Sequence, residues 1–460
     1  MALFAPLAIG RQALLAAERA IGVTGHNISN VNTPGYSRQT PLLHASRPDD
    51  RGFGTGVELR SVARSVDGFL DARQLSSAST LGGATTGRQL LDRLQSLFPV
   101  GDLGIGNALA EFFASANSLA DSPQDPAVRN ELLAAGSALA GQIRNSASGI
   151  ASLQREADQR LGQSAFEANG ILQNLASLNR EIIAAERGGR ETNDLRDQRQ
   201  VALGALASHL SIQVVEVDDG VNVFAASGQG LLIGTDAARL TTELDPTHVG
   251  LDGNPLSKIG ITARDGSVIS LSGDVGGTVG SLLELRDTTL PADSASLDLL
   301  AANLRDAVNL VQTNAAGRDL DGNVGAAFFS GTGAADLQVS LANARGIAAA
   351  QGANLSDNTN ALALSSVAQQ AIPALGGATL SAYFGTLHAR IGQEARSADD
   401  DATIQENVSE ALAAQREAVS GVSLDEEFTN LIRYQRAFQA ASQIINVSNV
   451  LLDDLIGLVR

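Results

Sequence analysis

Apolar residues recur every seven positions at both ends of this 460-residue chain. At the N-terminal end, one heptad position holds only large aliphatic residues: Leu7, Leu14, Ile21 and Ile28. At the C-terminal end, a longer seam alternates steps of three and four residues: Leu431, Tyr434, Phe438, Ala441, Ile445, Ser448, Leu452, Leu455 and Val459. Such repeats predict helices that pack along other helices in a coiled coil. We therefore expect the two ends to pair with each other, with copies of themselves, or both.

Neither terminal helix is well stabilised by its own sequence. Three glycines weaken the first one by roughly 1 kcal/mol each relative to alanine: Gly10, Gly22 and Gly25. At the other end, Ser423 and Glu426 have the spacing of a capping box, which predicts a helix from about 424 to 459, roughly 50 Å long. Because neither seam has an adequate core around it, we expect both segments to be poorly ordered in the free monomer.

A second helical block lies between these ends. Asp125-Pro126 is a favourable helix start, and apolar periodicity continues from there to about Arg187. Its seam consists of aliphatic residues: Leu132, Leu139, Ile143, Ile150, Leu153, Ile171, Leu175, Leu178 and Ile182. A turn at 187–194, a returning helix to His209 and a helical stretch from about Gly385 to Val419 complete the pattern of a rod-like bundle.

The pattern changes between 211 and 290, where apolar and polar residues alternate around Asp219-Gly220 and again around Asp265-Gly266. Both are hairpin signals, so we expect this segment to be mainly β, followed by a helix over 297–312 and irregular structure to about 375. The predicted fold is mainly α with an inserted β-rich domain (α+β). Its three units are 1–40 with 424–460 as paired terminal coiled-coil helices, 41–210 with 376–423 as a long helical bundle, and 211–375 as a β-rich outer domain with one helix.

Composition excludes several classes of protein. The net charge of −18 and a pI near 4.7 argue against nucleic-acid partners and against anionic membrane surfaces. With no cysteine, the chain has no disulfide, thiolate or zinc–thiolate chemistry. The N-terminus lacks the basic start of a secretory signal peptide. The longest uncharged stretch, about 358–389, is interrupted by proline and paired glycines, so we expect no membrane insertion.

No motif for catalysis, cofactor binding or metal binding stands out. The five histidines are scattered singly, and none has the spacing of a zinc helix. Asp319, Asp321 and Gly322 resemble part of a calcium loop, but the final glutamate of that loop is replaced by Ser330, so a turn is the better interpretation. The acidic runs at 399–401 and 425–427 are most simply solvated helix surfaces. We therefore expect a protein that is not an enzyme and needs no cofactor.

The stretch "NISNVNTPGY" (27–36) ends the first helix abruptly. Pro34 cannot continue a helix, and Pro34-Gly35 fits the centre of a type II turn between Thr33 and Tyr36. Asn27, Asn30 and Asn32 can bond to unpaired groups at the helix end. Taken alone, this pattern fits an ordinary helix stop within one domain.

A resemblance changes that interpretation. "TGHNISNVNTPGYSRQ" (24–39) is similar to the N-terminal signature of flagellar axial proteins, the rod, hook and hook-associated components, and its last four residues most resemble the hook–filament junction members. "GVSLDEEFTNLIRYQRAFQAA" (421–441) resembles the C-terminal motif of the same members. Segments 122–129, 193–200 and 317–329 also resemble landmarks of the family. The resemblance extends from end to end, strong at the termini and patchy over about 211–375.

The resemblance implies a structural protein of the bacterial flagellum, exported without signal cleavage and assembled outside the cell. Its partners would be copies of itself, hook protein, the next hook-associated protein, and an export chaperone on about Leu424 to Arg460. The assembly interface would comprise the large residues of the two terminal seams: Leu7, Leu14, Ile21, Ile28, Leu431, Tyr434, Phe438, Ile445, Leu452 and Leu455. The chaperone-binding residues would be Leu431, Phe438, Ile445 and Leu452. The family motif turn would comprise Asn27, Asn30, Asn32, Thr33, Pro34, Gly35 and Tyr36.

Three alternatives remain open at this point. A hook or distal rod protein would share the terminal segments and differ in the middle. A non-flagellar type III secreted helical protein would have similar coiled coils without the Asn-Thr-Pro-Gly-Tyr stop. A wall-degrading enzyme attached to the flagellum would need an acidic pair in a cleft.

Overall fold

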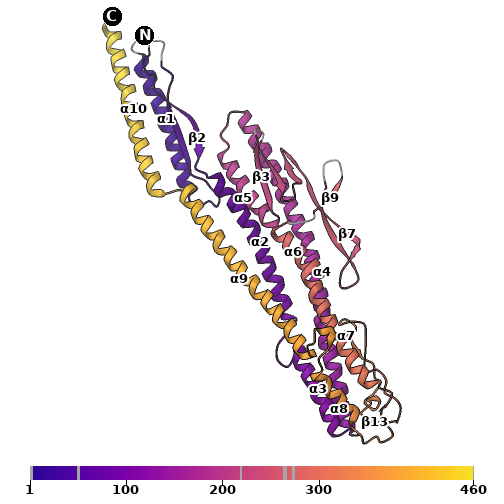
Figure 1. Cartoon of the computed structure of the whole chain (residues 1–460). Coiled ribbons are helices and arrows are strands. Elements are labelled where there is room, and N and C mark those ends of the chain that lie inside the picture. The colour runs from indigo at the N-terminus through magenta and orange to yellow at the C-terminus, as the bar shows by residue number, and fades with distance from the viewer. Residues whose placement is uncertain (1–3, 49–51, 218–219, 263–266, 272–274, 459–460) are drawn as a thin grey trace.

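The chain folds into a long rod of helices, with a hairpin of the two terminal helices projecting from one end (Figure 1). This computed structural model describes residues 4–48, 52–217, 220–262, 267–271 and 275–458. Two antiparallel sheets lie along one side of the middle of the rod. The mainly α architecture with a smaller strand-containing region confirms the predicted fold class.

The rod is built from long helices, among them α2 (Gly68–Ser96), α3 (Ile105–Asp121), α4 (Pro126–Arg187), α5 (Asn193–His209) and α9 (Leu380–Ser420). The 62-residue α4 begins as predicted, with the Asp125 carboxylate accepting a hydrogen bond from the Ala127 N–H and Pro126 in the first turn. Its predicted seam is buried except for Ile171, which is partly buried. The rod therefore has a continuous core along its length.

Two antiparallel sheets follow α5. The first contains β3 (Ile212–Val217), β4 (Gly220–Ala225), β5 (Gly230–Ile233) and β6 (Asp236–Ala237) in that order; the second contains β7 (Arg239–Val249), β8 (Pro255–Thr262) and β9 (Val268–Ser270). Both predicted hairpins are confirmed, since Val217 pairs with Gly220 and Thr262 pairs with Val268. Asp219, Asp265 and Gly266, at the predicted turns, lie outside the described residues.

The prediction of strands up to residue 290 is wrong. Residues 277–312 form α6 (Gly277–Glu284), a π-helical turn (Leu285–Thr289) and α7 (Leu290–Gln312). Their buried apolar residues are spaced by three and then five positions: Val279, Leu282, Leu285 and Leu290. Steps of three suit a helix, and the π-turn accommodates the step of five.

The segment after α7 wraps the end of the rod that is farthest from the terminal helices (Figure 1). It contains α8 (Thr359–Ser366), 3-10 turns at 344–346, 367–369 and 373–375, and two-residue strands at 317–318 (β10), 329–330 (β11), 338–339 (β12) and 350–351 (β13). Asp319 sits in a turn, because its Oδ1 accepts the backbone N–H groups of Asp321 and Asn323. That carboxylate is used by the turn itself, as the sequence predicted.

Residues 41–64 were expected in the helical bundle, but together with 39–40 they form a strand pair. They contain the antiparallel strands β1 (Gln39–Ala45) and β2 (Val57–Arg64), which lie against α1 (Phe4–Ser29). Pro41 is incompatible with a helix interior, and Val57 begins a run of alternating side chains. This strand pair gives α1 a wall that α10 (Leu424–Leu458) alone does not supply.

Candidate functional site

The two terminal helices lie side by side and antiparallel, outside the rod (Figure 1). The buried positions along this pair belong to small or polar side chains. On α1 they are Gly10, Ala16, Ala17, Ala20, Thr24 and Asn27, and on α10 they are Glu427, Ala441 and Ser448. A Cβ on Gly10 would lie 3.0 Å from Ile445 Cγ1, so this glycine permits close helix packing. The expected pairing of the chain ends is present, but small and polar side chains occupy the buried positions between the two helices.

The predicted large seam residues are not fully enclosed by this pairing. Nine of them are each only partly buried: Leu7, Leu14, Ile21, Ile28, Leu431, Tyr434, Phe438, Ile445 and Leu452. The side chain of Leu455 lies outside the described part of the structure. One face of each seam therefore remains available to another molecule.

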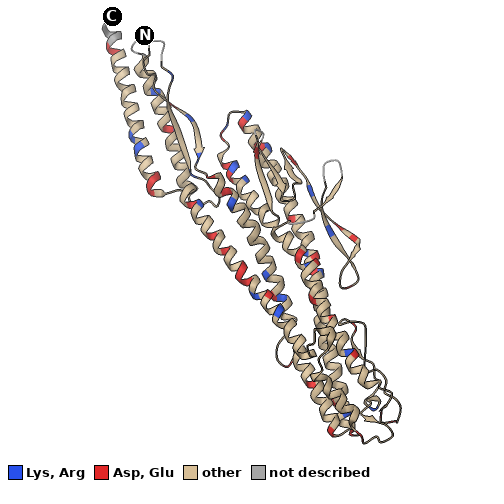
Figure 2. Cartoon of the chain, in the orientation of Figure 1, with Lys and Arg blue, Asp and Glu red and all other residues tan. Residues whose placement is uncertain are grey.

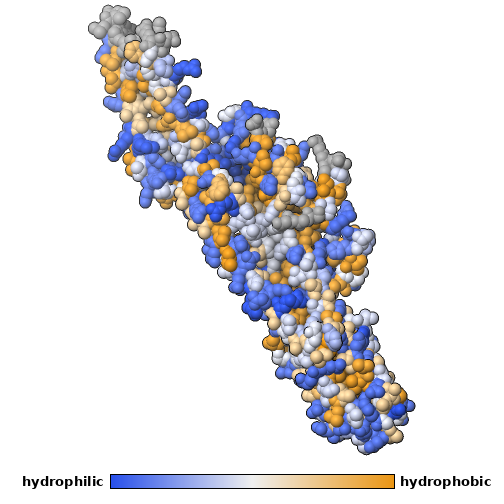
Figure 3. Space-filling view, viewed as in Figure 1, coloured by the Kyte–Doolittle hydropathy of each residue, from blue (hydrophilic) through white to orange (hydrophobic). Residues whose placement is uncertain are grey.

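A second set of large apolar side chains on α10 faces solvent. Phe428, Ile432, Val447 and Val450 are 50%, 51%, 50% and 59% exposed, and Leu424, Ile444 and Leu451 are also exposed. The space-filling view shows hydrophobic surface along this terminal hairpin (Figure 3). A helix that is apolar on its exposed side normally has a partner there.

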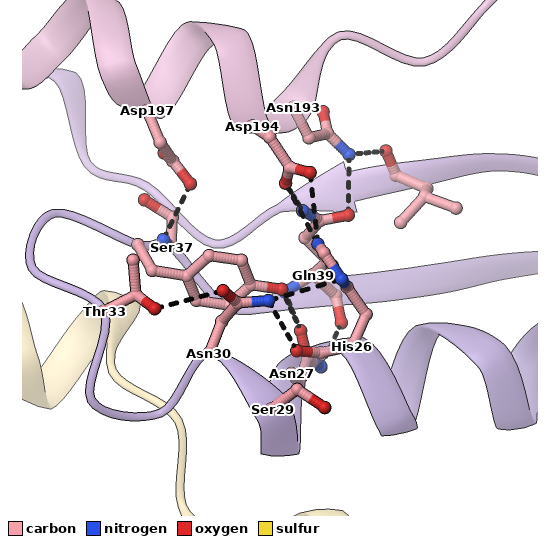
Figure 4. A network of polar contacts seen from close by, with 12 residues as sticks. His26, Asn27, Ser29, Asn30, Thr33, Ser37, Gln39, Asn193, Asp194 and Asp197 are labelled. Carbon is pink, nitrogen blue, oxygen red and sulfur yellow. Dashed lines mark hydrogen bonds and ion pairs between the residues drawn. The ribbon is translucent and has the colours of Figure 1, made fainter.

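At the base of the hairpin, Asn27 organises the chain that leaves α1 (Figure 4). Its Nδ2 donates to the Gln39 carbonyl at 2.8 Å, and its Oδ1 accepts from the Gln39 N–H at 3.0 Å and from the Tyr36 hydroxyl at 2.8 Å. The buried amide thus holds the start of β1 as a neighbouring strand would. The expectation that Asn27 caps the helix end is wrong in this detail.

Arg38 ties the same segment to α10. Its Nε lies 2.8 Å from Glu427 Oε1 and its Nη1 lies 2.6 Å from Glu426 Oε2, while its backbone N–H donates to the Ser420 carbonyl at the end of α9. Glu427 is almost completely buried and also accepts from Asn27. Glu426 therefore pairs with Arg38, which is a different role from the capping box predicted for it with Ser423.

The first turns of α5 supply the other side of the junction. The Asp197 carboxylate accepts the Ser37 N–H at 2.8 Å and pairs with Arg64 at 2.7 Å. Asp194 accepts from Gln39 Nε2 at 2.7 Å and lies 3.1 Å from His26 Nε2 (Figure 4). The segment that follows α1, the first turns of α5 and the start of α10 therefore meet at one point, although about 160 and 230 residues separate them in the sequence.

Tyr36 is the titratable group most affected by this environment. Burial raises the pKa of its hydroxyl, and the nearby carboxylates of Asp194, Asp197 and Glu427 raise it further. The phenol therefore stays protonated at neutral pH and keeps donating to Asn27.

The turn itself has the predicted geometry. The Tyr36 N–H donates to the Thr33 carbonyl at 3.2 Å, and Gly35 has φ of +80°, as a type II turn requires. A Cβ on Gly35 would come within 2.3 Å of Val201 Cγ2 on α5, and Arg416 Nη2 of α9 donates to the Gly35 carbonyl at 2.9 Å. The turn is thus a docking point for the rod.

The other two asparagines of the motif differ from each other. Asn30 does bond to the helix end, since its Nδ2 donates to the His26 carbonyl at 3.0 Å, and its Oδ1 accepts from the Thr33 hydroxyl. Asn32 is exposed and makes no side-chain hydrogen bond within the described chain. Asn30 therefore supports the predicted role, whereas Asn32 does not.

The sequence did not predict that Arg38, Asp197, Arg416 and Glu427 form the polar contacts at the base of the hairpin. All four are charged residues adjacent to or inside the resembling segments, and they become partners only when the chain folds. Across the part of the chain that the structure describes, no group of three or more His, Asp or Glu side chains is placed to hold a metal ion. In the same described residues, none of the helices is both long and apolar enough to cross a membrane.

Comparison with known proteins decides the family. The model of the flagellar hook-associated protein FlgK helical domain matches residues 91–329, which is more than half of the chain. The chain belongs to the FlgK family of flagellar hook-associated proteins. The model of the flagellar basal body rod FlgEFG protein C-terminal region also matches residues 414–458, which contain the end of α9 and all of α10.

Curated relatives agree with membership of the FlgK family over nearly the whole length. Flagellar hook-associated protein 1 of Bacillus subtilis (strain 168) is 28% identical, covering 99% of this chain and 98% of that protein. The protein of the same name from Salmonella typhimurium (strain LT2) is 25% identical, covering 97% and 98%. The flagellar hook junction protein FlgK of Burkholderia pseudomallei has the same fold, with a TM-score of 0.69 at 16% identity over 76% of this chain and all of that one.

Proposed function

We propose that this FlgK-family chain is a structural subunit that joins the hook of the bacterial flagellum to its filament by assembling through its terminal helices. The observation that carries the proposal is the α1–α10 hairpin, which projects from a well-packed rod while leaving large apolar side chains half exposed. Neighbouring subunits would supply the missing wall. The role is structural, with no catalytic step, cofactor or metal.

The energetics favour assembly over an isolated hairpin. Burying a large aliphatic or aromatic side chain completely contributes roughly 1.5–3 kcal/mol, and about half of that remains available at each half-exposed position. Seven such residues lie on the outer side of α10: Leu424, Phe428, Ile432, Ile444, Val447, Val450 and Leu451. Their combined burial exceeds the cost of ordering the helix only when neighbours are present. The contact is heterologous, so subunits stack helically until another component ends the series.

The junction at the hairpin base gives the assembly its geometry. Arg38, Glu427 and Asn27 fix the start of α10 against the end of α1, and Arg416 fixes the turn against α9. Force applied to the hairpin is therefore transmitted to the rod through buried polar contacts. The motif turn residues, Asn27 to Tyr36, act as a positioning element in this proposal.

The proposed partners are copies of this chain, hook protein on one side and the next hook-associated protein on the other. Before export, a chaperone would cover α10, with the partly buried seam residues Leu431, Phe438, Ile445 and Leu452 at the contact. The finished protein would lie outside the cell, and its export would need no cleaved signal.

A double substitution on the outer face of α10 tests the proposal. Val447→Asp with Val450→Asp leaves the buried positions Ala441 and Ser448 unchanged. We expect normal helix content by circular dichroism, loss of incorporation into flagella by immunogold labelling, and loss of motility. Ala413→Asp with Ala414→Asp, on the exposed side of α9, is the matched control and should incorporate normally. Normal incorporation of the α10 variant would contradict the proposal.

A further inference from the structure

A groove runs between α4 and the edges of the two sheets. It has a volume of about 850 Å³. From α4 it is lined by Gln173, Ala176 and Arg180, and from the strands and the turns between them by Gly230, Ile233, residues 235–239 and Thr262. β6 is the edge strand of one sheet and β7 the edge strand of the other, so the groove is bounded by strands without outer neighbours in these sheets.

The groove combines positive charge with an apolar patch. Arg180 and Arg239 are both exposed, and neither forms an ion pair with another described residue. Beside them, Ile233 is 48% exposed, next to Ala237 and Ala238. The carboxylate of Asp236 also lines the groove, and the two arginines leave the groove with a net positive charge in a chain whose net charge is −18, so this surface suits an anionic partner.

The complementary surface lies on the opposite edge of the rod. The exposed side of α9 carries Asp399, Asp400 and Asp401, followed by Glu406 and Glu410. Figure 2 shows acidic residues along α9, on the side of the rod away from the sheets. Asp400 makes no ion pair within the described chain, and Asp399 has only a long contact with Arg88 at 3.7 Å.

This acidic stretch also contains an apolar residue that has no packing role in the monomer. Ile404 is 56% exposed in the middle of α9. One edge therefore presents carboxylates beside an isoleucine, and the other presents arginines beside an isoleucine. The two edges match in both charge and apolar character.

We propose that the acidic stretch of α9 from one copy docks into the Arg180–Arg239 groove of the adjacent copy. This inference rests on the proposed assembly, and it adds a second contact between rods to the contact between terminal helices. Copies that each carry a charge of −18 repel one another, and a local match of opposite charges lowers that repulsion. The same match fixes the position of each rod relative to its lateral neighbour. Because the two surfaces differ, the contact is heterologous and can repeat around the axis.

Introduced cysteines test the contact directly, since the chain has no cysteine of its own. In the variant carrying Ile233→Cys and Ile404→Cys, oxidation of isolated flagella should produce a ladder of covalent multimers on a non-reducing gel. A disulfide needs Cα atoms within about 7 Å, so random encounters contribute little. Ile233→Cys with Leu310→Cys is the control, because Leu310 is exposed but lies on α7. It should give no ladder.

The outcomes separate this inference from the proposed function. A variant that is present in flagella but gives no ladder overturns the inference and leaves the proposed function intact. A chain absent from flagella contradicts the proposed function. Oxidation of the concentrated purified protein then decides the groove contact alone: disulfide-linked copies support it, and their absence overturns it.

A charge exchange provides an independent measurement. Arg180→Glu with Arg239→Glu should raise the concentration needed for assembly about tenfold, a loss typical of two interfacial ion pairs. Adding Asp400→Arg and Asp401→Arg, which flank Ile404 on α9, to the same chain should restore assembly to within about threefold. Arg60→Glu with Arg190→Glu changes the net charge equally outside the groove and should have little effect. Failure of the four-residue exchange to restore assembly overturns the inference.

Discussion

The rod and the terminal hairpin are both built from long helices, yet they differ in how much of their apolar surface they enclose. In the rod, α4 places a seam of large aliphatic side chains in a closed core. In the hairpin, the enclosed positions are mostly glycine and alanine, while phenylalanine, isoleucine and leucine remain partly or largely exposed. The same helical periodicity thus produces a complete interior in one region and an incomplete one in the other. Our predictions test this difference.

The largest effect is expected from removing an aromatic ring in the rod. Phe112 is fully buried against Phe113, Phe328 and Phe329. Phe112→Ala should lower the free energy of unfolding by about 3–5 kcal/mol in urea titrations. Phe438→Ala, the same change in the hairpin, should cost less than about 1 kcal/mol in the free monomer. Equal losses would remove the contrast between the two regions.

A smaller effect is expected at the junction that links them. Arg38→Met leaves the buried Glu427 carboxylate without its cation, and such a loss costs about 3 kcal/mol or more locally. Hydrogen exchange of amides in 33–39 and 424–428 should then accelerate about a hundredfold. Adding Glu427→Gln removes the stranded charge and should recover much of the protection. No change in exchange would show that the polar contacts do not hold the hairpin to the rod.

Within the rod, Asp293 gives stability a pH dependence. Burial raises the pKa of its carboxyl to about 6, although Arg390 Nη2 lies 2.7 Å from Oδ1. A raised pKa means that the folded state keeps its proton while the unfolded state has lost it. This group therefore lowers stability progressively as pH rises from about 4 to about 6.

Asp293→Asn should remove that slope and raise the free energy of unfolding at pH 7 by about 2 kcal/mol. Asp306→Asn, on an exposed part of the same helix, should leave the slope unchanged. Urea titrations at pH 4, 5, 6 and 7 measure both. A slope that persists in the Asp293 variant would place the titrating group elsewhere.

The smallest effects are expected from the glycines of α1. A Cβ on Gly22 meets nothing within 4 Å, so Gly22→Ala should stabilise the helix by roughly 0.5–1 kcal/mol. Gly10→Ala should bring little or no gain, because its Cβ would lie 3.0 Å from Ile445 Cγ1. Helix content by circular dichroism compares the two variants, and an equal gain at both positions would argue against close α1–α10 packing.

Local rules predicted the elements well, and long-range partners poorly. Asp125-Pro126 predicted the start of α4, and Pro34-Gly35 predicted the turn that follows α1. Both signals depend only on neighbouring residues. The seven-residue repeats predicted that the chain ends pair. The strands β1 and β2 were missed, because their alternation is short and their partner, α1, is recognised only in the folded chain.

The junction illustrates the same limit for the candidate site. The turn residues were visible in the sequence, but the pairing of Arg38 with Glu426 and Glu427 spans almost 400 residues. Asp197 and Arg416 reach the same point from two other helices. Nothing in local propensity or spacing indicates such contacts, since each partner is an ordinary charged residue on its own helix.

Hydrogen exchange followed by mass spectrometry, on the free monomer and on assembled material, shows whether the terminal helices become fully packed only among neighbouring subunits. We expect residues 4–24 and 431–458 to exchange rapidly in the monomer, with the amides of α4 and α5 strongly protected, and the terminal residues to become protected only after assembly. Strong protection of both terminal helices in the monomer, unchanged by assembly, would contradict the account.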